Sequence, residues 1–159
     1  MTHQLDAVDH KIINCLVEDG RMSAQAIARQ FDLSERTIRN RLARLLANKV
    51  ISVSANINKR ALGYGVTADI FCEVESRRVS EVAEQIAQLP EVGYVACSLG
   101  DQDISVQVYA RSNQELYEIV EGKLAQIPGI IRTRTVVVPR IVKSIWEWQV
   151  PLEPDPEDE

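Results

Sequence analysis

The chain lacks a long apolar run, and this absence limits where it can act. None of its apolar stretches approaches the ~20 residues that a transmembrane helix needs. The segment Met1 to Asp6 does not show the charged and then apolar pattern of a signal peptide. We therefore expect a cytoplasmic protein. The 159 residues allow one medium domain or two small ones, and 45% apolar with 26% charged residues is ordinary for a globular protein.

Cysteine and histidine are scarce, which limits the available chemistry. The cysteines Cys15, Cys72 and Cys97 are odd in number and far apart, a spacing that fits neither a disulfide framework nor a zinc site. Each lies in an apolar segment, so we expect all three to be small buried hydrophobes. The only histidines are His3 and His10, and no metal site is predicted.

Motifs of common enzyme classes are also missing. The chain contains no Gly-x-Gly-x-x-Gly, no P-loop and no nucleophile elbow. No serine lies in a triad pattern, and the paired acids Asp101 and Asp103 share a short loop without a nearby base. The sequence therefore predicts no catalytic residue and no cofactor, and we do not expect an enzyme.

Residues 23–46 contain the most informative pattern, a short helix, a tight turn and a second helix rich in arginine. In a helix-turn-helix, the second helix lies in the DNA major groove. Ser34 can cap this helix, and apolar residues recur at helical spacing from Ile38 to Leu46. The opposite side carries guanidinium groups and an amide, which pair with phosphates and purine edges. An amphipathic helix with a solvated basic face is the other interpretation.

The predicted DNA contacts all come from this segment. Three side chains are expected to face the groove: Arg36, Asn40 and Arg44. Three neighbours are expected to contact phosphates or the groove edge: Thr37, Arg39 and Arg41. Two serines at helix starts are expected to present backbone N–H groups to phosphates: Ser23 and Ser34.

Charge divides along the chain. Residues 1–60 hold 10 basic and 6 acidic residues, a net charge of +4, whereas residues 61–159 hold 8 basic and 17 acidic residues, a net charge of −9. Phosphate binding depends on the local potential, so the overall charge of −5 does not exclude DNA. The end of the chain, residues 151–159, is almost all acid and proline, and we expect a solvated, flexible tail. The alternative is a mimic of DNA phosphates that competes for the basic helix.

The second half contains an internal repeat, because residues 87–92 recur as residues 125–130. An amphipathic helix precedes each copy and a strand follows it. The order is β-α-β-β-α-β, the ferredoxin-like plan, with strands over these ranges: 66–74, 92–99, 104–110 and 130–138. Two helices would cover one face of the sheet. We expect Phe71 and Tyr109 on the other face, and a second subunit to cover it.

Two further segments have alternating patterns that favour strands. Residues 49–57, which follow the predicted three-helix unit, should form a strand or wing. Near the end of the chain, Trp146, Trp148 and Val150 alternate as in a terminal strand with one aromatic face. Subunit packing and a ligand-stacking platform are both compatible with that face.

The chain resembles the Lrp/AsnC family of leucine-responsive and asparagine regulators up to about Trp148. The residues that carry the resemblance are Leu5-Asp6 with Asp9, Asp19-Gly20-Arg21 with Ser23, Ile27-Ala28, Leu33-Ser34, Thr37-Ile38-Arg39 with Arg41, Val50-Ile51, the Gly100 loop and Pro128-Gly129-Ile130. The resemblance implies an α+β protein with an N-terminal winged helix-turn-helix over residues 1–50. It also implies a linking strand and hinge over 51–64, and a ferredoxin-like effector-sensing (RAM) domain over 65–150.

The resemblance also implies partners. Family members form dimers that commonly build octamers or other higher assemblies, and small molecules, typically amino acids, bind where subunits meet. Carried over to this sequence, the effector site falls on a loop and on the final strand: Ser98, Gly100, Asp101, Gln102, Asp103, Thr133 and Thr135. Gln102 stands where the family pattern often has an aromatic residue. A β-hairpin turn accounts equally well for the Gly and Asp of this loop.

These observations predict a sequence-specific DNA-binding transcriptional regulator, modulated by an amino acid or a related small metabolite. Two alternatives share the architecture. A siroheme-decarboxylase-like enzyme would need catalytic histidines in the second half, which has none. A sensing partner that does not bind DNA would have little reason to keep an arginine-rich helix.

Overall fold

The computed structural model describes residues 5–148, which form two compact units. One unit consists of residues 5–56 with residues 142–148, and the other is Ile57–Ile141. Among the described residues, no helix has both the length and the apolar character needed to span a bilayer. The predicted acidic tail, residues 151–159, lies outside the described residues.

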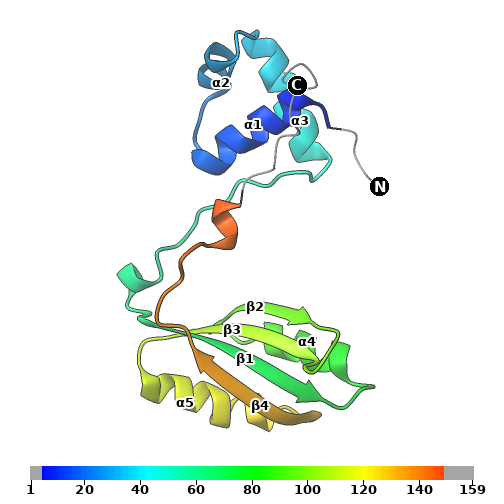
Figure 1. The fold of residues 1–159 in the computed structure, drawn as a ribbon, viewed down its shortest axis with the longest axis vertical. Helices are drawn as coiled ribbons and strands as arrows, with labels where there is room; N and C mark the ends of the chain where they lie inside the picture. Colours follow the sequence, from blue (N-terminus) through cyan, green and yellow to red (C-terminus); the bar gives the residue numbers. More distant parts are fainter. Residues whose placement is uncertain (1–4, 149–159) are drawn as a thin grey trace, which may run out of the picture. The chain divides into compact units, whose positions relative to one another are not determined.

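The first unit is built on three helices, α1 (Ala7–Glu18), α2 (Ala24–Gln30) and α3 (Glu35–Ala47), shown in Figure 1. Each helix begins with a side chain that accepts a backbone N–H three residues later, from Asp6, Ser23 and Ser34 respectively. The predicted cap at Ser34 is therefore confirmed. The core is made of fully buried side chains from all three helices: Ile12, Ile27, Ile38 and Leu45.

The chain after α3 differs from the sequence expectation. Residues 49–57 alternate like a strand, but residues 51–58 adopt neither helix nor strand. An extended segment becomes a strand only when its N–H and C=O groups pair with a neighbouring strand. Within the described chain this segment has no such partner. Over residues 51–58 the described chain is therefore irregular, and the expected wing and linking strand are not formed there.

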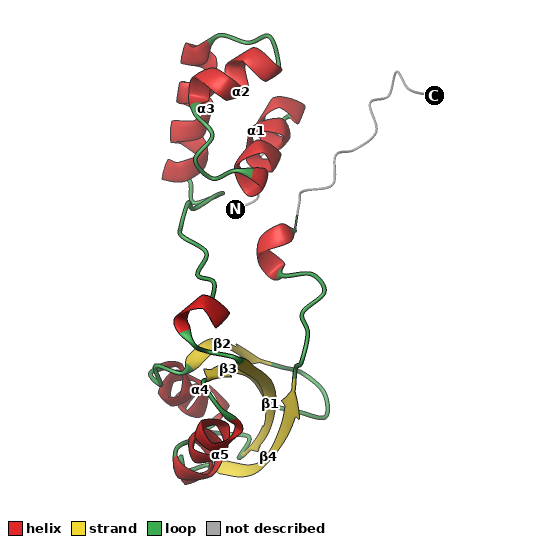
Figure 2. Ribbon diagram, turned by 90° about the vertical axis from the view of Figure 1, so that its left-hand side faces the viewer, coloured by secondary structure: helices red, strands yellow, loops and turns green. Residues whose placement is uncertain are grey.

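The second unit has the predicted β-α-β-β-α-β order (Figure 1). Its elements are β1 (Val66–Val74), α4 (Val79–Ala87), β2 (Val92–Cys97), β3 (Ile104–Ala110), α5 (Asn113–Gly122) and β4 (Ile130–Val137). The strands form one antiparallel sheet in the order β2-β3-β1-β4. Figure 2 shows both helices on the same face of this sheet. The ferredoxin-like fold is thus confirmed.

Alternation along the strands separates the two faces of the sheet. Ala68, Ile70 and Cys72 on β1 are fully buried in the core beneath the helices. Phe71 and Tyr109 lie between such positions and point to the face that no helix of this unit covers, where both are half-buried. Their placement on that face agrees with the sequence analysis, and its coverage by a second subunit stays a prediction.

Two expectations need correction. Cys15 and Cys72 are buried, but Cys97 is exposed because it ends β2, an edge strand of the sheet. Near the end of the described chain, a 3-10 helix over Ile145–Glu147 replaces the expected strand of Trp146 and Trp148. Val150, its third predicted member, lies outside the described residues. Alternation alone cannot create a strand where no neighbouring strand offers hydrogen bonds.

Candidate nucleic-acid interface and ligand cavity

The exposed face of α3 is the surface that the sequence assigns to DNA. Arg36, Arg39, Asn40 and Ala43 are exposed and recur at intervals of three and four residues, so they share one side of the helix. Ile38 and Leu45 are buried on the opposite side, whereas Leu46, expected in the apolar stripe, is 42% exposed. The helix therefore packs through a narrow stripe and leaves a broad basic and polar face.

Arg36 and Asn40 have no side-chain hydrogen bond or ion pair within residues 5–148. Both are exposed. A guanidinium and an amide in this state can each make two hydrogen bonds to a purine edge without breaking an internal contact. They are the two groups on α3 that are most available to a ligand.

Arg39 and Thr37 have local partners. Arg39 donates to Glu35 at 2.6 and 2.8 Å, but the two side chains are 69% and 40% exposed. Exposed pairs of this kind contribute little, so a phosphate can replace Glu35. The Thr37 hydroxyl lies 2.7 Å from that of Ser34, whose hydroxyl also caps α3.

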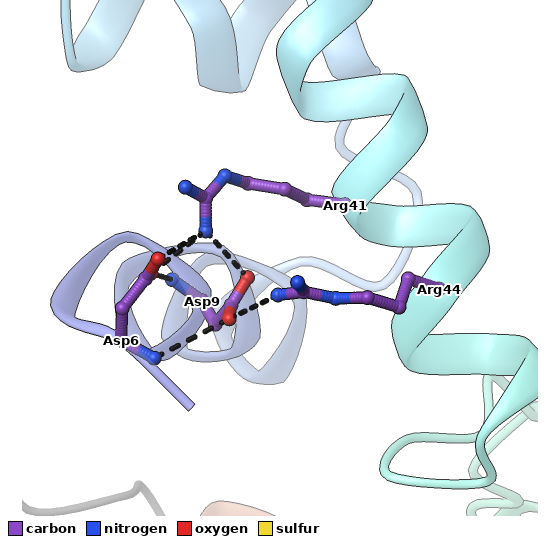
Figure 3. Close-up of polar contacts among 4 residues, drawn as sticks. All are labelled: Asp6, Asp9, Arg41 and Arg44. Atoms are coloured by element: carbon purple, nitrogen blue, oxygen red, sulfur yellow. Dashed lines mark hydrogen bonds and ion pairs between the residues drawn. The ribbon is translucent and has the colours of Figure 1, made fainter. Parts of the chain in front are cut away.

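Arg41 and Arg44 point toward the start of α1 and meet two carboxylates there (Figure 3). Arg41 donates to both carboxylate oxygens of Asp6 at 2.7 Å and to Asp9 at 2.9 Å, and Arg44 donates to Asp9 at 2.5 Å. The side chain of Asp9 is completely buried. The sequence predicts that Arg41 and Arg44 contact DNA, and this stays a prediction. The structure adds internal partners for both.

The same contacts shift two pKa values. The hydrogen bond from Arg41, aided by the backbone N–H of Asp9, lowers the pKa of Asp6. The hydrogen bonds to Asp6 and Asp9 raise the pKa of Arg41. Sequence reasoning missed this cluster. Its available signal was the three-residue spacing of the acids, which is that of a capping box.

Ser23 and Ser34 use their side chains to cap α2 and α3, at 3.2 and 3.0 Å from the N–H groups of Ala26 and Thr37. Caps of this type leave other N–H groups of the first turn without helical partners. The expected contact of these helix starts with phosphates stays a prediction.

The second unit contains a shallow cavity of about 130 Å³ at one end of the sheet. Its lining combines an aromatic ring, an acid, two arginines, an amide and a hydroxyl: Phe71, Glu73, Gln102, Arg132, Thr133 and Arg134. The Arg134 guanidinium lies 4.9 Å from the centre of the Phe71 ring. This mixture of charges can hold a small zwitterion or anion.

The cavity includes only part of the predicted effector site. Gln102 and Thr133 line it, whereas the other predicted residues are not among its lining residues: Ser98, Gly100, Asp101, Asp103 and Thr135. The Asp103 carboxylate accepts the backbone N–H of Val74 at 2.7 Å, so it fastens the loop to the end of β1. Thr135 pairs with Ile70, whose side chain faces the helices.

Sequence reasoning missed the other four lining residues, Phe71, Glu73, Arg132 and Arg134. They alternate on β1 and β4, and the register places Phe71 opposite Arg134 and Glu73 opposite Arg132. The alternation along each strand is visible in the sequence. The register in which β1 pairs with β4 is not visible there, and this register brings the four residues together.

Comparison with known proteins shows which class of protein combines such a three-helix unit with a ferredoxin-like sheet, namely helix-turn-helix regulators that carry a ligand binding domain. Residues 5–46 match the AsnC-type helix-turn-helix domain, and residues 67–145 match the Lrp/AsnC ligand binding domain. An uncharacterised HTH-type transcriptional regulator of Pyrococcus abyssi is 39% identical over 141 residues, which is 88% of this chain and 89% of that protein. The HTH-type transcriptional regulator FL11 of Pyrococcus furiosus is 33% identical over 147 residues, covering 92% and 97%.

Solved structures share the fold. AsnC of E. coli superposes with a TM-score of 0.83 at 24% identity, covering 91% of this chain and 99% of that one. A transcriptional regulator of Neisseria meningitidis in complex with L-Met has a TM-score of 0.83 at 22% identity, covering 89% and 94%. The chain belongs to the Lrp/AsnC family of HTH-type transcriptional regulators. The names of these relatives favour regulation over the siroheme-decarboxylase-like alternative.

Proposed function

We propose that this regulator binds duplex DNA by placing the exposed face of α3 in the major groove. The observation that carries the proposal is that Arg36 and Asn40 are exposed on that face and have no side-chain partner within residues 5–148. Arg36 is suited to the O6 and N7 atoms of guanine, and Asn40 to the N6 and N7 atoms of adenine. These two residues would read sequence.

Phosphate contacts come from around this pair. Arg39 can exchange Glu35 for a phosphate because both side chains are exposed. Thr37 and the N–H groups at the starts of α2 and α3, next to Ser23 and Ser34, add neutral hydrogen-bond donors. Contacts of this kind fix the register of the protein on the duplex and carry no sequence information.

The test is the substitution Arg36→Ala, measured by fluorescence anisotropy. The duplexes are one recovered by selection from a random library and one unselected duplex of equal length. Loss of a bidentate base contact should weaken binding to the selected duplex by about 1–3 kcal/mol and leave the unselected one much less affected. Arg77→Ala, which removes an equal charge from an exposed position in the second unit, is the matched control.

Each other result has a definite meaning. Equal weakening on both duplexes would reassign Arg36 to phosphate, and unchanged binding to both would remove it from the interface. If the folded wild-type protein ignores duplex DNA even at low ionic strength, the proposed function is wrong.

We also propose that the protein assembles through the open face of its sheet. That face carries the half-buried aromatic rings of Phe71 and Tyr109, and β4 adds Val136, which is 44% exposed. A partner subunit would bury these apolar groups. The family resemblance supports dimers that build octamers or other higher assemblies. Light scattering at several concentrations measures the assembly, and a monomer at all of them would contradict it.

The cavity of the second unit supports binding of an amino acid or a related small metabolite. Arg132 and Arg134 suit a carboxylate, Glu73 suits an ammonium group, and Gln102 with Thr133 supply neutral hydrogen bonds. The loop residues Ser98, Gly100, Asp101 and Asp103 would shape its rim, whereas Thr135, opposite Ile70 on β4, would face the helices. The regulator of Neisseria meningitidis, which has the same fold, was solved with L-Met. A ligand can change the affinity for DNA only if it binds two states of the protein with different affinities, and if these two states also bind DNA with different affinities.

Calorimetric titration of the full protein with the twenty amino acids tests the effector. Arg134→Met keeps the length and apolar body of the side chain over Phe71 and removes its charge. It should abolish binding of any amino acid that binds the wild type. Equal binding by wild type and variant would move the site elsewhere.

A further inference from the structure

Asp9 is a buried carboxylate that accepts hydrogen bonds from three donors. It lies at the third position of α1, where its Oδ2 accepts the backbone N–H of Asp6 at 3.3 Å. Its oxygens also accept hydrogen bonds from Arg41 at 2.9 Å and Arg44 at 2.5 Å. The side chain has no solvent exposure, so these three donors are its replacement for water.

The two arginines come from one side of α3, because residues three apart on a helix are neighbours on its surface. Arg41 is 25% exposed and Arg44 is 51% exposed. Asp6 binds Arg41 as well, and its own carboxylate caps α1 through the N–H of Asp9. One cluster, drawn in Figure 3, therefore connects the start of α1 to the second half of the recognition helix.

Charge in this cluster is balanced internally. Two carboxylates face two guanidinium groups, so neither arginine carries an unpaired charge. A phosphate that approached Arg41 or Arg44 would have to displace a carboxylate, and displacement from Asp9 would leave a buried charge without its partner. Displacing a partner of Arg36 or Arg39 carries no such penalty in the part of the chain that the structure describes, since Arg36 has no side-chain partner there and Arg39 pairs with the exposed Glu35.

We propose that Asp9 is a positioning residue for DNA recognition. It fixes the orientation of α3 on α1 through Arg41 and Arg44, and it keeps both arginines away from DNA phosphates, in place of the DNA contact that the sequence predicts for them. The helix then presents Arg36 and Asn40 in a defined orientation, and its sequence-independent attraction to DNA is reduced. This inference rests on the proposed function, and it concerns specificity rather than the existence of DNA binding.

The salt dependence of DNA binding distinguishes a positioning residue from one that contacts a phosphate. The logarithm of the DNA-binding constant falls with the logarithm of salt concentration by about 0.9 for each phosphate that the protein neutralises. Arg44→Gln, at a half-exposed position, should leave this slope unchanged. Arg39→Gln should lower it by about 0.9 for each bound subunit.

Specificity gives the second readout, as the ratio of affinities for the selected and unselected duplexes. Arg44→Gln should lower this ratio by about tenfold, the size of a weakened base contact. Arg44→Lys retains a cation for Asp9 and should restore most of the ratio.

Asp9→Asn removes the central charge with little change of shape. If the variant folds, its specificity ratio should fall about tenfold and its affinity for unselected duplex should rise, because the released guanidinium groups can reach phosphates. Glu18→Gln removes the same charge at the exposed far end of α1 and is the matched control. If Asp9→Asn does not fold, the Arg44 variants decide the question alone.

A lower salt slope for Arg44→Gln would show direct phosphate contact and overturn the inference. So would an unchanged specificity ratio for Arg44→Gln. Failure of the wild-type protein to bind any duplex would instead reject the proposed function, so the two failures are distinguishable.

Discussion

At the residue scale, partners decide what each arginine of α3 can do. Arg36 has no side-chain partner among the described residues, Arg39 pairs with the exposed Glu35 one turn away, and Arg41 and Arg44 pair with acids at the start of α1. The sequence alone does not distinguish these four arginines, because helical spacing shows which side of α3 a residue occupies but not which helix packs there. The packing of α1 against α3 distinguishes them, since only Arg41 and Arg44 meet acids of α1.

The three cysteines also differ in their surroundings, and the rate of alkylation measures this difference. The thiolate is the reactive form. Burial raises the pKa of Cys72 to about 11, and burial together with Glu18 raises the pKa of Cys15, whereas Cys97 is exposed. At pH 8, iodoacetamide should modify Cys97 alone in the folded protein and all three cysteines in urea, as counted by mass spectrometry. Modification of Cys72 as fast as Cys97 without urea would contradict this placement.

Asp6 predicts a pH dependence with a definite sign. Arg41 lowers the pKa of Asp6 in the folded state below the ordinary value of about 3.9. The interaction therefore contributes its full stability above pH 4 to 5 and loses it as the pH falls through the folded pKa. The side chain is 54% exposed, so solvent screening makes the contribution small.

Asp6→Asn tests this dependence, because asparagine keeps the cap of α1. The variant should be less stable than the wild type at pH 7 and closer to it at pH 3, by urea unfolding followed with circular dichroism. The same difference in unfolding free energy at both pH values would mean that the pair contributes nothing through the charge of Asp6.

At the element scale, β2 and β3 approach closely where the backbone of Gly93 meets the ring of Tyr109. The register of β2 with β3 shifts between Val92 and Tyr94, and Gly93 lies at that shift. A Cβ on Gly93 would be 2.1 Å from the Tyr109 ring. That ring is held by its hydroxyl, which donates to Gln107 at 2.7 Å, and by Lys59 Nζ, 4.2 Å from the ring centre.

Gly93→Ala should therefore destabilise the second unit by about 1–3 kcal/mol, the usual cost of overpacking. In a Tyr109→Leu background the same change should cost less, because the obstructing ring atoms are gone. Unfolding of the single and double variants gives the coupling. Equal costs in both backgrounds would mean that the ring moves aside freely.

Elements with strong periodicity could be predicted from the sequence. The repeat of residues 87–92 at 125–130 predicted both helices and the strands that follow, because alternation along the strands is regular. Pro90 lies three residues after α4, but α5 ends at Gly122 and a 3-10 helix over Leu124–Gln126 separates it from Pro128. Alternation wrongly predicted strands at residues 49–57 and at Trp146 and Trp148, where the described chain provides no neighbouring strand. The ligand cavity could not be predicted either, because its lining depends on the register between β1 and β4, which no local sequence pattern indicates.

At the scale of the whole molecule, the described chain has two separate cores. One includes Ile12, Ile27 and Ile38 from the three helices, and the other includes Ile70 and Ile104 from the sheet. Among the described residues the two buried clusters share no member. Loss of packing in one core should then open only the unit that contains it.

Hydrogen exchange of the full protein, resolved by peptide mass spectrometry, tests this separation with Ile27→Ala and Ile70→Ala. Each substitution leaves a cavity at a fully buried site and should cost about 2–5 kcal/mol. Ile27→Ala should speed exchange in α1, α2 and α3 and leave the sheet protected, and Ile70→Ala should do the reverse. Faster exchange in both units from either variant would show that they open together. Separate opening would favour control of DNA binding by a ligand in the second unit through the assembly and the linking segments, because the two units would then not unfold cooperatively.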